Sequence, residues 1–342
     1  MAKCAFCDAS FETGPGDVLL VCPYCGTAQT TEGTKFKDHY MIRVHFNQND
    51  AQTTLLDWVS KQLGAPADLP TTAAFVENQQ VWYPFWISRV DARTDYQGMG
   101  RDATFHDEWM QRPGAYKRIN FFWKPESGQF TRRHEINIAG VKDIDPDIRG
   151  HPIPTRAKEY FSHAHAEEYA GKVLHSNMTE DDAKAAARQE AVDRQTRLVL
   201  QEVSKIESRK DDINVGETFL IHVPVWEFTY RYGNKKYKAS VSAATGYVIE
   251  SQYPRSMSYR AGGIGVGLLM LIIGAGLILL ALNQLDVLEL GLLDQLLILL
   301  GQLFGSVPQL QGGGFISGAM LSILGLVLMY KGASRKQAKE SV

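Results

Sequence analysis

Hydrophobic and polar residues divide the chain into three parts. Residues 36–255 show apolar residues at helical spacing in some segments and apolar–polar alternation in others, as amphipathic helices and half-buried strands do. Beyond residue 260, two uncharged apolar stretches occupy 261–282 and 312–330. The pattern predicts an α+β fold with a small N-terminal module, a mixed helix-and-sheet region and a C-terminal hairpin of two transmembrane helices.

Helices are expected in three places of the mixed region. The first has an apolar stripe, begins at Asn49 or Asp50 and ends before Gly64. The second runs over 179–208 and begins with Thr-Glu-Asp-Asp, a capping-box variant with aspartate in place of glutamate or glutamine. The third is expected over 155–174. We expect strands to follow the first and second helices.

One short motif, hydrophobic-Pro-hydrophobic-Trp, occurs twice, in residues 81–87 and in residues 222–228. Because proline cannot donate to a sheet ladder, we expect each motif to open its sheet and each tryptophan to fill a core. Alternation and turn residues at the second copy predict an antiparallel meander over 217–250. The repeat indicates two related helix-plus-antiparallel-sheet modules, 36–145 and 146–255.

All four cysteines of the chain lie at its start, in two CxxC pairs: Cys4, Cys7, Cys22 and Cys25. Each pair places two thiolates at one tight turn, and two facing turns make the tetrahedral sulfur cage that zinc prefers. A redox CxxC normally begins a helix in a βαβ unit, and these pairs lack that context. The spacing predicts one structural Zn²⁺ in a zinc ribbon formed by residues 1–35.

Charge limits the partners of this ribbon. The whole chain has a formal net charge of −2, so no global field draws it to nucleic acid or to anionic lipid. Residues 1–37 have three lysines, no arginine and four acidic residues. Nucleic-acid binding depends on phosphate neutralisation by lysine and arginine, so the ribbon is expected to bind protein or to cap the fold.

The flanks of the two apolar stretches predict their orientation. Arg255 and Arg260 precede the first stretch, and a basic tail, 331–342, follows the second. The intervening loop carries acidic residues and no basic one, so the positive-inside bias places both ends in the cytosol. No apolar signal segment precedes the ribbon, and reduced cysteines suit the cytosol. We expect a multi-pass protein of the cytoplasmic membrane, embedded in the lipid bilayer.

Between the two apolar stretches, leucines recur every three or four residues over 285–304. This amphipathic segment could lie on the outer leaflet, dip into it, or pack against a second copy. A third full span would bury carboxylates in the membrane, which is costly. Each apolar stretch also contains a GxxxG pattern, Gly263 to Gly267 and Gly314 to Gly318, which favours close helix packing or reflects the glycine content of membrane helices.

Catalytic motifs are absent from the sequence: it has no GxSxG, no HExxH and no cysteine outside the two pairs. The segment His163-Ala-His165 with Glu167 is interpreted as a solvated helix face, and the acidic run 143–147 as a surface turn. Aromatic and basic residues over 109–133 could form an RNA-stacking surface, but aromatics at strand spacing more often fill a core. We predict no catalytic or cofactor-binding residue.

Taken together, the CPxCG ribbon, the paired Pro-x-Trp strands, the Thr-Gly meander and the following helical hairpin resemble a group of bacterial and archaeal membrane proteins with a TFIIB-type zinc ribbon. The meander is similar to the PepSY-like module. Some members resemble envelope-stress adaptors that recruit partners to the membrane, and some relatives are labelled replication helicase components. The chain has no Gly-x-x-x-x-Gly-Lys-Ser/Thr loop, which argues against an ATPase.

From these observations we expect a membrane-anchored adaptor or scaffold whose cytosolic modules bind protein partners, in keeping with envelope stress. An enzyme or peptidase regulator with a site between the two modules is an alternative, and a membrane-tethered nucleic-acid-binding protein is another. A homo-oligomer could form through the transmembrane helices or the leucine-striped segment.

Overall fold

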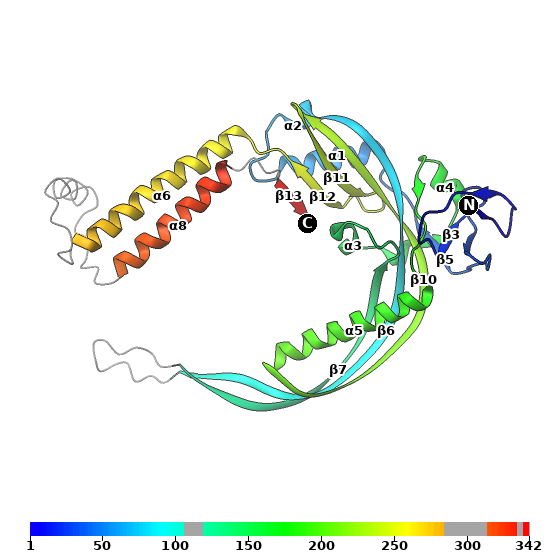
Figure 1. The fold of residues 1–342 in the computed structure, drawn as a ribbon, viewed down its shortest axis with the longest axis horizontal. Coiled ribbons are helices and arrows are strands. Elements are labelled where there is room, and N and C mark those ends of the chain that lie inside the picture. The colour runs from blue at the N-terminus through cyan, green and yellow to red at the C-terminus, as the bar shows by residue number, and fades with distance from the viewer. Residues whose placement is uncertain (106–118, 284–312, 334–337, 342) are drawn as a thin grey trace.

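The computed structural model describes residues 1–105, 119–283, 313–333 and 338–341. The predicted amphipathic segment 285–304 lies outside the described residues. The chain forms a mixed α+β structure in which one long, curled sheet dominates (Figure 1).

The sheet is built on two very long strands that pair antiparallel with each other, β6 and β10. Along its main path the strands follow the order β7 (Ile119–Ala139), β6 (Ala74–Phe105), β10 (Lys205–Tyr232), β11 (Lys235–Ser242), β12 (Val248–Tyr253) and β13 (Ala338–Ser341). Three short strands join its edges: β5 (His39–Ile42), β8 (Lys158–Tyr160) and β9 (Lys172–Val173). The antiparallel meander is confirmed as β10, β11 and β12.

A local two-fold axis relates the two Pro-x-Trp motifs. On adjacent antiparallel strands, Tyr83 of β6 lies directly opposite Val223 of β10, and each of them precedes the proline of its motif. Pro84 and Pro224 therefore lie on either side of the axis. The prediction that each proline opens a sheet is wrong, because both lie inside the longest strands of the protein.

Proline is tolerated there because its nitrogen, which carries no hydrogen, faces a position where the neighbouring strand has ended and no acceptor needs it. The Pro84 carbonyl accepts a hydrogen bond from the Gly140 amide at 2.8 Å, just beyond the end of β7. The Pro224 carbonyl accepts from the Ala243 amide at 2.9 Å, just beyond the end of β11. In an antiparallel strand the N–H and C=O of one residue point to the same side. Each proline nitrogen thus faces an edge where ladder pairing stops.

The same symmetry governs the helices. The short strand β5 precedes α1 (Gln48–Ser60) and pairs with β10, and α1 packs on β10 and β11. The short strand β9 precedes α5 (Glu180–Glu202) and pairs with β6, and α5 packs on β6 and β7. Each half of 36–255 therefore gives a strand and a helix to the other half, and the two predicted modules share one sheet.

Local signals placed the helix starts better than the helix ends. Helix α5 begins with the predicted capping box of Thr179 and Asp182, but it ends at Glu202 because the chain enters β10 at Lys205 and pairs with β6. Helix α1 is capped by Asn47, whose side chain accepts from the Asp50 amide at 3.0 Å, slightly earlier than expected.

The helix expected over 155–174 is wrong. This segment forms a 3₁₀ turn (Thr155–Ala157), β8, the short α4 (His163–Glu167) and β9. Its backbone completes two open sheet edges, since Glu159 pairs with Met41 of β5 and Val173 pairs with Trp82 of β6. Sheet pairing here overrides the local helical pattern. Two more short helices are α2 (Leu69–Thr72) and α3 (Pro146–Gly150).

At the C-terminal end, α6 (Met257–Asn283) and α8 (Gly313–Ala333) pack side by side and project away from the sheet (Figure 1). Their backbones meet at Gly267 and Gly325, where a Cβ added to Gly267 would lie 2.7 Å from the Gly325 carbonyl oxygen. Close packing at Gly267, one of the two interpretations that the sequence left open, is present, and the residue that Gly267 meets is Gly325, outside the second GxxxG pattern.

Among the described residues, one helix is long and apolar enough to cross a membrane, Met257–Ile278. Only 11% of its most apolar window is buried inside the protein, whereas the core helix of a soluble protein would be mostly buried. Residues Ala319–Tyr330 form a shorter apolar helix. The structure thus supports one candidate span, and it does not by itself support the two-span topology.

Candidate metal centre

The four cysteines lie on two matching turns of the ribbon. Its strands are β1 (Ala2–Lys3), β2 (Ser10–Phe11), β3 (Leu19–Val21) and β4 (Ala28–Thr30), paired as two hairpins. In the first turn Asp8 adopts φ 61°, and in the second Gly26 adopts φ 72°. Each of these residues directly follows the second cysteine of its pair, and its amide donates to the carbonyl of the first cysteine. The two CxxC pairs therefore have the same backbone geometry.

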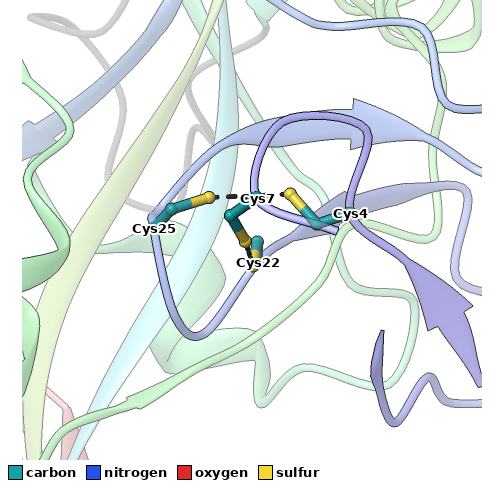
Figure 2. Close-up of side chains that lie close together, drawn as sticks. All are labelled: Cys4, Cys7, Cys22 and Cys25. Carbon is teal, nitrogen blue, oxygen red and sulfur yellow. Dashed lines mark hydrogen bonds between the residues drawn. The ribbon is translucent and has the colours of Figure 1, made fainter. Parts of the chain in front are cut away.

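The sulfur atoms converge at distances that suit zinc (Figure 2). The Sγ atoms of Cys4 and Cys25 are 3.6 Å apart, and those of Cys7 and Cys22 are 3.7 Å apart. All four lie within 4.8 Å of one another. A tetrahedral zinc with Zn–S bonds of about 2.3 Å separates its sulfurs by about 3.8 Å, whereas a disulfide needs about 2.05 Å. The cluster fits a metal and not a disulfide.

The surroundings of the sulfurs also favour a bound cation. Cys4 and Cys22 are buried, and burial raises the pKa of the Cys22 thiol to about 12. Burial also acts on Cys25, but hydrogen bonds with the Thr27 hydroxyl and backbone outweigh it and lower its pKa to about 7. A buried thiol becomes a thiolate when a cation offsets its charge. Four sulfur ligands leave no open position for water or substrate, so zinc would be structural here.

The ribbon is joined to the sheet by backbone hydrogen bonds. Ser176, which follows β9, accepts from the Val18 and Leu19 amides at 2.8 and 3.0 Å and donates its own amide to the Leu19 carbonyl at 3.0 Å. The Leu19 side chain packs on Trp86 of the first Pro-x-Trp motif. The ribbon is therefore docked on the sheet. The sequence alone did not decide whether it docks or moves freely.

A buried histidine pair lies in the same part of the fold, and sequence reasoning missed it. His39 Nε2 and His222 Nδ1 are 2.8 Å apart, and His222 Nε2 lies 3.0 Å from the Leu174 carbonyl oxygen. Because a carbonyl only accepts, His222 donates from Nε2 and accepts from His39 at Nδ1. Burial lowers the pKa of His39 and lowers that of His222 to about 4. Both rings are neutral at pH 7.

The histidines considered for a second metal take no part in a metal cluster within the described residues. His163 and Glu167 share a helix face as predicted, with Nε2 and Oε1 2.9 Å apart. Besides the cysteines, one cluster of carboxylates forms among the described residues. Asp145 and Asp147 lie beside Glu250 of β12, with carboxylate oxygens within 4.8 Å of one another. The Asp145 side chain also caps α3, accepting from the Asp147 amide at 2.9 Å.

Asp145 and Glu250 border a cavity of about 490 Å³ that is lined by β6, β10, β11 and β12 of the sheet and by α3. Among its lining residues are Glu77, Tyr83, Glu227 and Glu250. The Tyr83 hydroxyl donates to the Glu227 carboxylate, and burial together with this acceptor raises the pKa of Tyr83. Sequence reasoning did not identify the residues that line this cavity, because Asp145 and Glu250 are distant along the chain.

Comparison with protein-family models, with curated proteins and with solved structures finds no match. The resemblance to zinc-ribbon membrane proteins is therefore supported only by the cysteine cluster, and no finding supports a PepSY relationship.

Proposed function

We propose that the protein is a membrane-anchored adaptor whose docked zinc ribbon binds a protein partner. The observation that carries this proposal is the placement of two aromatic side chains, Phe6 and Tyr24. Each lies inside one CxxC turn, and they are 69% and 65% exposed. Aromatic side chains that become buried on binding are frequent hot spots of protein interfaces. Exposed aromatic side chains on a fixed turn therefore suit a binding surface.

The rigidity of this surface supports a recruiting role. The ribbon core buries Phe11 and Leu20 with Cys4 and Cys22, while Phe6 and Tyr24 on the two CxxC turns are exposed. Zinc would fix both turns, and the pairing at Ser176 would fix the ribbon on the sheet. A preorganised surface loses less conformational entropy on binding than a flexible one.

The anchor in this proposal is α6 together with α8. The apolar surface of α6 is largely exposed, and Arg255 and Arg260 precede its uncharged stretch. With Lys331 and the other basic residues after the second stretch, the positive-inside bias places the ribbon and the sheet in the cytosol. Resistance to alkaline extraction, with protease access to an N-terminal tag from the cytosolic side only, tests this topology.

Site-specific crosslinking tests the recruiting surface. A photoreactive amino acid replaces Phe6 or Tyr24 in the full chain, in its native membrane, and Leu200 on α5 serves as an exposed control position. The proposal expects one protein to crosslink at both ribbon positions and not at Leu200. It expects the crosslink to disappear in Cys22→Ser, which removes a zinc ligand. Equal crosslinking at all three positions, or none at the ribbon, would contradict it.

A second candidate function, an enzyme or a peptidase regulator, is favoured by the carboxylate-lined cavity, to which both predicted modules contribute residues. Tyr83 and Glu227 form a hydrogen-bonded pair at its wall, with Tyr83 next to the local two-fold axis. Screening the full chain against ester, phosphate and peptide substrates, beside Tyr83→Phe and Glu227→Gln, tests it. Turnover that both variants lose would favour an enzyme, and inhibition of a peptidase that both variants lose would favour a regulator.

A further inference from the structure

The sheet extends into a long arm whose end carries two exposed aromatic side chains. The arm consists of β7, the second half of β6 and the first half of β10, with α5 packed along one face (Figure 1). Near its described end, Phe122 and Trp123 of β7 lie opposite Asp102 and Arg101 of β6. Phe122 is 44% and Trp123 is 56% exposed. The expectation that aromatic residues of this strand fill a core is wrong for these two.

The end of α5 explains their exposure. Alanines of α5 pack on Val90 and Ala92, and farther along the arm Val199 packs on Tyr96. The helix ends at Glu202, close to the position where β10 first pairs with Met99. Beyond that point no described helix covers the strands, so aromatic side chains there face the surroundings.

The two aromatic residues occupy opposite faces of the arm. Successive residues of a strand point to opposite sides of the sheet, so Phe122 lies on one face and Trp123 on the other. A protein partner seated on one face would cover only one of them. A medium that surrounds the end of the arm accommodates both, and the interfacial layer of a bilayer is such a medium.

The arm and the apolar helices leave the body of the protein on the same side (Figure 1). Helix α6 has 27 residues, which corresponds to about 40 Å. At about 3.3 Å per residue, β6 covers about 60 Å of contour between Tyr83 and Arg101. Because the arm ends on the side to which α6 projects (Figure 1), a membrane entered by α6 is the surface that the end of the arm faces.

We propose that the end of the arm inserts Phe122 and Trp123 into the interfacial layer of the same membrane that α6 enters. Tryptophan is enriched at this depth because its ring combines an apolar body with a polar N–H. This inference rests on the proposed membrane anchor and extends it. The sheet would contact the membrane at two separate points, which fixes the orientation of the docked ribbon relative to the bilayer.

Fluorescence quenching by brominated lipids tests the insertion. The full chain is reconstituted into phosphatidylcholine vesicles with or without bromine near the carbonyl end of the acyl chains. Trp123→Phe removes one of six fluorophores and keeps an aromatic ring. Trp86→Phe removes a fully buried fluorophore as the control. We expect the quenched signal to fall in Trp123→Phe and to stay unchanged in Trp86→Phe.

Alkaline extraction of the same vesicles separates this inference from the proposed anchor. If the chain is released from the vesicles, the anchor itself is refuted. If the chain is retained, and brominated lipid quenches the same amount of fluorescence in wild type and in Trp123→Phe, the arm does not reach the bilayer. In that case the insertion of the arm is refuted and the proposed anchor is not. Iodide in the aqueous phase should quench Trp123 in detergent-free vesicles weakly if it is inserted, and strongly if it is not.

Discussion

Acidification should destabilise the protein through the buried histidine pair. His222 is fully buried, its pKa is lowered from 6.5 to about 4, and it accepts a hydrogen bond from His39. Below pH 6.5 the unfolded chain binds a proton at this histidine that the folded chain does not bind. The contribution of His222 to the free energy of unfolding is therefore fully present above pH 6.5, and it is lost progressively as the pH falls toward 4.

The size of this effect follows from the two pKa values. With 6.5 in the unfolded state and about 4 in the folded state, a change from pH 7 to pH 5 costs about 2 kcal/mol at His222 alone. For a domain of this size that corresponds to a fall in Tm of about 4–8 °C. Differential scanning fluorimetry of the full chain in detergent, at constant ionic strength and with excess zinc, measures it.

A matched pair of variants isolates the contribution of the pair. His222→Gln keeps a donor for the Leu174 carbonyl but does not titrate in this range, so its Tm should depend less on pH than that of the wild type. His45→Gln, at an exposed histidine, is the matched control. Equal pH dependence in wild type and His222→Gln would refute the reasoning, whatever the absolute stability of the variant.

Three further predictions concern packing and the metal. Gly267→Leu should separate α6 from α8 and lower the free energy of unfolding by about 1–3 kcal/mol. Gly265→Leu, at a position with open space, should lower it much less, and thermal unfolding in detergent compares the two variants. Trp226→Phe removes the indole donor to the Phe46 carbonyl, 2.9 Å away, and leaves that acceptor unpaired, so it should lower the free energy of unfolding by about 1–3 kcal/mol in denaturant titration. Cys22→Ser should lower bound zinc, measured by atomic absorption, and speed amide exchange throughout the ribbon.

The parts of this protein that the sequence predicted are those encoded locally. Two CxxC pairs need only two tight turns to bring their sulfurs together, so Cys4, Cys7, Cys22 and Cys25 could be recognised from spacing. The capping box at Thr179 is a contact between residues three positions apart. The meander from β10 to β12 follows from short turns between alternating strands.

The parts that the sequence did not predict depend on pairing between distant segments. The segment 155–174 has a helical composition, but two open sheet edges offer its backbone more hydrogen bonds than a lone helix would. His39 and His222 are 183 positions apart, and nothing near either residue indicates the other. The acidic cavity likewise forms only when α3 and β12 meet.

The local two-fold axis shows where the two halves have diverged. Trp82 and His222 occupy equivalent positions, two residues before the proline of each motif, and each lies beside the parallel strand that the other half supplies. The indole ring packs in a small apolar cluster with Met41 and Ala166, whereas the imidazole hydrogen-bonds to His39.

The ribbon adds to this asymmetry, because Leu19 covers Trp86 while α1 covers the equivalent Trp226. A protein built only for stability could keep the same side chains on both sides of such an axis. The neutral histidine pair and the docked metal module instead occupy one side of it. Under the proposed function the repeated sheet is the scaffold, and the docked ribbon, which breaks its symmetry, carries the surface for the partner.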